Sequence, residues 1–72
     1  MPRYYFDLVD SKTVSDEGGS ELPGDSEAMD VAEELARRLR AERPELKGRH
    51  YSIRVTNQDG DEIGRCPIDP VN

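Results

Sequence analysis

The stretch DSEAMDVAEELARRLRAERP, residues 25–44, decides the fold of this chain. Its apolar residues recur every three or four positions, at Ala28, Val31, Ala32, Leu35 and Leu39. An α-helix turns once in about 3.6 residues, so these side chains share one face that a sheet can cover. Arginines gather toward the end of the stretch, where cations favour the helix dipole. Pro44 disfavours helical geometry at Arg43, and we expect the helix to end there.

Segments on both sides of this helix have the alternating pattern of β-strands. Residues 3–9 are rich in aromatic and β-branched types, and residues 13–15 are a weak partner strand that leads into a polar loop at 16–20. Residues 51–56 alternate again, and residues 63–68 return as the last strand. The sequence therefore predicts two hairpins, one before the helix and one after it.

The second hairpin has the clearer turn, and the four strands together define the fold class. Gly60 can take the positive φ that closes a turn over residues 57–60. Pro67 lacks a ladder amide, so the last strand lies at a sheet edge or ends at this residue. We expect a single α+β domain over residues 1–72 with the element order ββαββ. Its antiparallel four-stranded sheet has the order 2-1-3-4 and packs the helix on one face, which leaves the other face open.

Charge and composition exclude several functions. The chain of 72 residues has a net charge of -6, and its acidic residues are concentrated before Leu35. Phosphate contacts need a basic surface, so the charge argues against a general nucleic-acid binder. No apolar run approaches the roughly 18 residues of a membrane span, and the pattern of a signal peptide is absent. Because Cys66 is the only cysteine, we expect a soluble cytoplasmic protein without disulfides.

Residues that carry metal or catalytic chemistry do not form a recognisable set. Asp59, Asp61 and Glu62 surround a turn but lack the spacing of a calcium loop. His50 and Cys66 are the candidate soft ligands or nucleophiles, and two residues make neither a zinc site nor a catalytic triad. We therefore expect no metal, no cofactor and no enzymatic activity, and no small-molecule ligand is evident.

Basic residues at the end of the helix and after it are candidates for holding an anion, since arginine forms bidentate charge-assisted bonds. They are Arg37, Arg40, Arg43, Lys47 and Arg49. Complementarity to the helix dipole and pairing with nearby glutamates explain the same residues without a ligand, and we favour that interpretation.

The sheet face opposite the helix is the candidate interaction surface. We assign Tyr5, Val9 and Tyr51 to it. A domain of this size gains only marginal stability from its own core, and tyrosine is enriched at binding hot spots. The sequence therefore predicts a homodimer that forms through this face.

Three fragments in order cover almost the whole chain and carry a family resemblance. They are the opening MPRYYFD, the pattern Asp16-x-x-Gly19-x-Glu21-Leu22 before the helix, and Val55-x-x-x-x-Gly60-x-x-Ile63-x-x-x-Pro67. The chain resembles a family of short proteobacterial proteins, common in rhizobia, that is a domain of unknown function. Asp7 departs from the histidine that is frequent in such proteins, and Ile68 stands where an aromatic residue is common. The resemblance implies a small α+β fold and supplies no activity.

These observations favour a non-enzymatic module that acts through protein contact, as a homodimer or with another protein, and not at a membrane. The alternative is a small nucleic-acid-associated regulator that uses the basic end of the helix, because residues 16–28 also resemble the antitoxin half of toxin-antitoxin pairs. Salt-dependent retention on DNA distinguishes the two hypotheses, since counterion release makes nucleic-acid binding steeply dependent on salt.

Overall fold

A computed structural model describes residues 1–10, 14–46 and 50–68. Four antiparallel strands form one sheet in the order β2-β1-β3-β4. The strands are β1 (Arg3–Val9), β2 (Val14–Glu21), β3 (Ser52–Thr56) and β4 (Glu62–Pro67). One helix, α1 (Asp25–Glu42), follows β2 and leads into a short 3-10 helix, η1 (Pro44–Leu46). The predicted α+β class, the ββαββ order and the sheet order are therefore confirmed.

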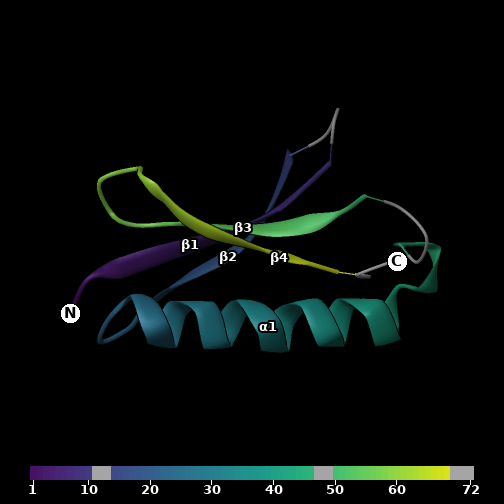
Figure 1. Ribbon diagram of the computed structural model, residues 1–72, viewed down its shortest axis with the longest axis horizontal. Coiled ribbons are helices and arrows are strands. Elements are labelled where there is room, and N and C mark those ends of the chain that lie inside the picture. The colour runs from purple at the N-terminus through teal and green to yellow at the C-terminus, as the bar shows by residue number, and fades with distance from the viewer. Residues whose placement is uncertain (11–13, 47–49, 69–72) are drawn as a thin grey trace.

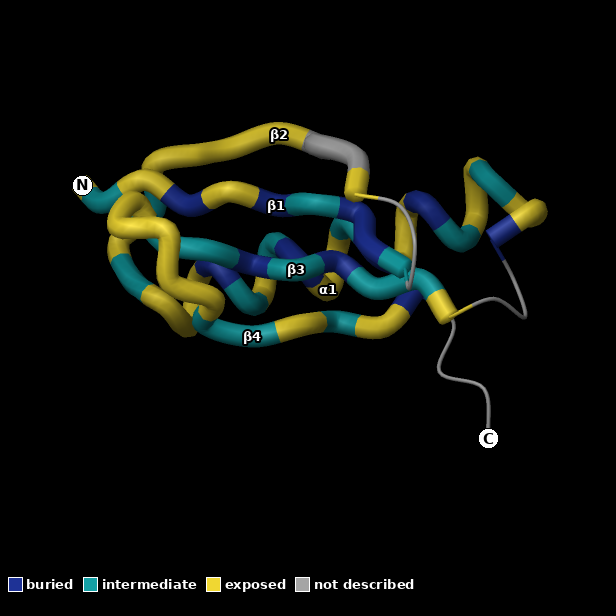
Figure 2. Tube along the Cα trace, turned by 90° about the horizontal axis from the view of Figure 1, so that it is seen from above, coloured by how far each residue is buried: buried dark blue, intermediate teal, exposed yellow. Residues whose placement is uncertain are grey.

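The helix covers one face of the sheet, and no element of the described chain covers the other face (Figure 1). α1 packs mainly against β3 and β4. In the view from above, the helix runs beneath β3, whereas β2 forms the far edge of the sheet (Figure 2). The helix-facing surface of the sheet is therefore covered more closely on its β3 and β4 side than along β2.

The buried side of α1 is rotated from the predicted stripe. Ala28, Ala32 and Leu39 are buried as expected, and Ala36 joins them. Val31 and Leu35 are only partly buried, although both still pack against the core. Three alanines four residues apart allow the helix to approach β3 and β4 closely, and this orientation leaves the larger Val31 and Leu35 on the side that faces β2. The helix ends at Glu42, one residue before the predicted position, and the amide of Arg43 donates to Leu39 O at 2.7 Å.

The core lies between α1 and the central strands. Alternate residues of β1 and β3 supply the sheet side of it, as the sequence pattern predicts: Tyr4, Phe6, Leu8, Ile53 and Val55. The hydroxyl of Tyr4 donates to Asp25 Oδ1 at 2.7 Å, which ties β1 to the first turn of the helix. The pKa of Tyr4 is raised, chiefly because this hydrogen bond holds the hydroxyl proton. Burial and the negative charges of Asp25 and Glu27 raise the pKa further.

The strand β2 differs most from the prediction. The residues expected to form a polar loop at 16–20 continue the strand to Glu21 and pair with β1. The register shifts between Phe6 and Asp7, where β2 contains one extra residue, and Gly18 beside this bulge has a φ of 128°. Pairing with a regular neighbour therefore holds a glycine-rich segment in a strand that its own composition does not favour.

The second hairpin has the predicted turn. Gly60 has a φ of 88°, and its amide donates to Asn57 O at 3.0 Å. The side-chain Oδ1 of Asn57 accepts the amides of Asp59 at 3.0 Å and Asp61 at 2.9 Å. A second register shift follows, between Val55 and Thr56. β4 lies at the sheet edge, as predicted, and ends at Pro67, one residue before the end of the predicted strand.

Candidate functional site

The uncovered side of the sheet carries a row of charged side chains at its centre. The strand register aligns Asp7 of β1 with Arg54 of β3, and Arg54 with Arg65 of β4. Arg54 Nη2 donates to Asp7 Oδ2 at 3.2 Å, and the side chains of Arg54 and Asp7 are 31% and 16% exposed. Within the described residues, Arg54 Nε is buried without an acceptor. This ion pair is therefore partly shielded from solvent even though it lies on the open face.

Exposed apolar groups lie on both sides of this charged row. Tyr5 is 40% exposed, and the guanidinium carbon of Arg3 lies 5.8 Å from the centroid of its ring. Val14 is 60% exposed and pairs with Val9 across the β1–β2 ladder. We use the name open face for the surface formed by Tyr5, Asp7, Val14, Arg54 and Arg65. It combines exposed apolar groups with a central row of charges.

Two of the three residues assigned to this face are not available there. Val9 is 3% exposed, and Tyr51 packs against the core on the helix side. Tyr51 has the same strand parity as Ile53 and Val55, so the alternation itself places it toward the helix. Val14 is an exposed residue that the sequence did not place on this face. The strand pattern over residues 13–15 is too short and weak to predict which way the Val14 side chain points.

The basic residues predicted as anion contacts at the end of the helix differ in their neighbours. Arg37 donates to Glu34 at 2.9 Å, and Arg43 to Glu45 at 3.4 Å. Arg40 lies with Arg37 beside a small hollow of about 170 Å³ that also contains Cys66. Lys47 and Arg49 lie outside the described residues. The two ion pairs agree with pairing to nearby glutamates, and the role of these residues toward an anion stays a prediction.

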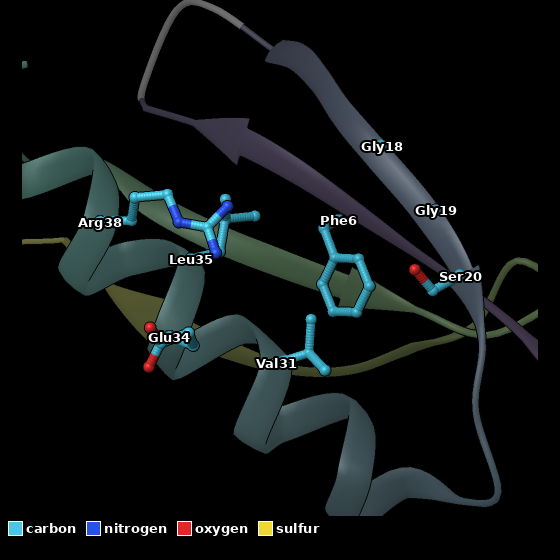
Figure 3. A pocket seen from close by; sticks show the side chains of 8 residues that line it. All are labelled: Phe6, Gly18, Gly19, Ser20, Val31, Glu34, Leu35 and Arg38. Carbon is cyan, nitrogen blue, oxygen red and sulfur yellow. The ribbon is translucent and has the colours of Figure 1, made fainter. Parts of the chain in front are cut away.

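A second surface feature lies on the helix side of the sheet, between α1 and β2. It is an open groove of about 360 Å³. Its lining residues are Phe6, Gly18, Gly19, Ser20, Val31, Glu34, Leu35 and Arg38. Phe6 and Val31 point into the space between helix and strand, and the guanidinium of Arg38 extends over Leu35 toward it (Figure 3). We call this feature the β2 groove.

The comparison with known families covers nearly the whole fold. Residues 3–69 match the family described as Domain of unknown function (DUF6894). The chain belongs to this family. The match includes β1 to β4 and α1, so the open face and the β2 groove are both parts of the DUF6894 domain. No curated protein and no solved structure matches the chain.

Among the described residues, no three His, Cys, Asp or Glu side chains are placed to hold a metal ion. Burial raises the pKa of the Cys66 thiol, and Glu33 raises it further. A thiol with a raised pKa is mainly protonated near neutral pH, whereas a nucleophilic cysteine needs the thiolate. No helix in the described part of this domain combines the length and hydropathy of a membrane span.

Proposed function

We propose that this domain is a non-enzymatic interaction module that pairs with a second copy of itself through the open face. The observation that carries the proposal is that Tyr5 and Val14 are exposed on a sheet face that no described element covers. One helix shields only one side of a sheet, and a small domain gains stability when a partner covers the other side. Tyrosine is a frequent anchor in such contacts.

The charges of the open face support a particular arrangement of the two copies. Asp7 and Arg54 lie side by side near the middle of the sheet. If the two-fold axis runs parallel to the strands, Asp7 of one copy lies over Arg54 of its partner, and four alternating charges meet. If the axis runs across the strands, like charges meet instead, which is unfavourable. The same parallel axis brings β2 of one copy over β4 of the other. The strand register aligns Val14, Val9, Ser52 and Pro67 in one row across the sheet. Val14 of one copy therefore lies over Pro67 of its partner.

The proposed dimer predicts a clear response to a charge placed within its apolar part. Tyr5→Asp introduces an unpaired carboxylate into the contact, so the mass measured by light scattering or sedimentation should fall from dimer to monomer. Ala41→Asp is the matched control, because Ala41 is exposed on the helix and the substitution adds the same charge away from the open face. Circular dichroism of both variants checks that the fold is retained. A wild-type chain that stays monomeric at high micromolar concentration contradicts the proposal.

The orientation has its own test in mixtures of wild type and a charge-swapped double variant, Asp7→Arg with Arg54→Asp. The swap keeps the pair within each copy and keeps opposite charges facing each other in its own homodimer. A mixed dimer, however, brings like charges together if the axis is parallel to the strands. We therefore expect few mixed dimers by native mass spectrometry. An excess of mixed dimers indicates the axis across the strands and contradicts the arrangement, while leaving self-association intact.

A further inference from the structure

We propose that the β2 groove binds a small amphipathic carboxylate, with its apolar body between α1 and β2 and its carboxylate on Arg38. The groove lies on the helix side of the sheet, opposite the open face. The inference is therefore independent of the proposed dimer. It assigns the domain a ligand as well as a protein partner.

The apolar part of the groove comes from the way the helix packs. Val31 and Leu35 belong to the apolar stripe of α1, but the helix leans toward β3 and β4 and leaves both partly exposed. Phe6 forms the floor between them and β2. Val31 and Leu35 therefore present their exposed apolar surface to the groove, next to the buried ring of Phe6. Covering such a surface with an apolar ligand removes it from water, which is the main source of affinity in most small-molecule sites.

The opposite wall leaves room for a ligand because the described β2 residues that line it are two glycines and a serine. Gly18 pairs with Phe6, so a side chain at this position points to the helix side of the sheet. A Cβ built on Gly18 meets no atom within 4 Å. The positive φ of Gly18 disfavours any larger residue at this position. The bulge that requires this glycine therefore also keeps the groove open, and its volume of about 360 Å³ is within the range of small-molecule pockets.

The charge of the ligand follows from Glu34 and Arg38, the ionic side chains that line the groove within the described part of the chain. Glu34 accepts a hydrogen bond from Arg37 at 2.9 Å, so its charge is balanced on the helix surface. Arg38 takes part in no ion pair or hydrogen bond within the described residues. Its guanidinium extends over Leu35, whereas the carboxylate of Glu34 points away from Phe6 (Figure 3). An anionic group at the end of an apolar body complements this arrangement, and guanidinium binds a carboxylate in a bidentate manner.

Octanoate is the probe, used below its micelle concentration, and 1-octanol is its uncharged counterpart. Amide shifts in two-dimensional NMR spectra should change saturably in β2 and in the helix turn of Val31 to Leu35. We expect octanoate to bind more tightly than octanol. Arg38→Gln should weaken octanoate binding by about two- to fivefold, the range expected for an exposed ion pair, and leave octanol binding unchanged. Arg40→Gln is the matched control, since Arg40 lines a different hollow of the same helix.

A second variant tests the apolar part. Ser20→Trp places a large ring in the groove from β2 and should abolish the binding of both probes, while the NMR spectrum of β3 and β4 shows that the fold is kept. Saturable binding to Ser20→Trp as strong as to wild type overturns the site. Equal affinity of octanoate for wild type and Arg38→Gln overturns the carboxylate assignment. Shift changes confined to the open face overturn the whole proposal.

Discussion

The two helix leucines should differ in what they contribute to stability, although both belong to the stripe that predicts the helix. Leu39 is 6% exposed and packs within the core, whereas Leu35 lines the open β2 groove. Leu39→Ala removes buried methyl groups and leaves a cavity, so we expect it to cost about 2–5 kcal/mol. Leu35→Ala widens a groove that is already open to water. We expect a cost of about 1 kcal/mol, roughly half the transfer value of a fully buried leucine.

These costs are large for a chain of 72 residues, whose whole free energy of unfolding is about 4–11 kcal/mol. A loss of about 3 kcal/mol lowers the melting temperature of such a domain by about 12–24 °C. Urea and thermal unfolding followed by circular dichroism measure both variants against wild type. Each leucine is the control for the other, because the chemical change is identical. Equal midpoints, or a larger loss for Leu35→Ala, refute the packing of α1 over β3 and β4.

The remaining predictions concern local hydrogen bonds and the second hairpin. Gly60→Ala places a Cβ on a residue with positive φ and should destabilise the domain by about 1 kcal/mol in urea unfolding. Asn57→Ala should cost about as much, because the amides of Asp59 and Asp61 lose their acceptor. Unchanged unfolding midpoints for both variants contradict the turn. Because the pKa of Tyr4 is raised in the folded state, the stability that its hydrogen bond contributes is complete below the ordinary tyrosine pKa of 10.0. This contribution falls as the pH rises above that value, because the unfolded chain loses the tyrosine proton first. Tyr4→Phe should remove that part of the alkaline loss of stability, and an identical pH profile for the variant and wild type contradicts the assignment.

Sequence patterns predicted the elements of this fold better than they predicted its surfaces. The period of the apolar residues is a local property, so it identified α1 and the strands with Phe6 and Ile53. It does not specify where the helix axis crosses the sheet, and for that reason Val31 and Leu35 looked like core residues. The strand at Gly18 depends on pairing with β1, which the local composition does not reveal. The β2 groove results from these two nonlocal features, and sequence reasoning missed it for the same reason.

The exposure of the residues predicted for the interface also depends on nonlocal contacts. Alternation places Tyr5 correctly on the open face, and the same rule applied to β3 places Tyr51 on the helix side. Val9 has the parity of Tyr5 but is 3% exposed. Parity therefore gives the direction of a side chain, whereas its exposure depends on the neighbours that the fold brings to it.

The two register shifts on either side of the Phe6–Val55 pair have a consequence for aggregation. Each lies between a central strand and an edge strand, so both edges of the sheet are irregular. A bulge bends its strand and increases the local twist, which makes a poor template for an added strand. Pro67 further limits pairing at the β4 edge. The irregular edges of the sheet thus oppose strand-by-strand growth into fibres.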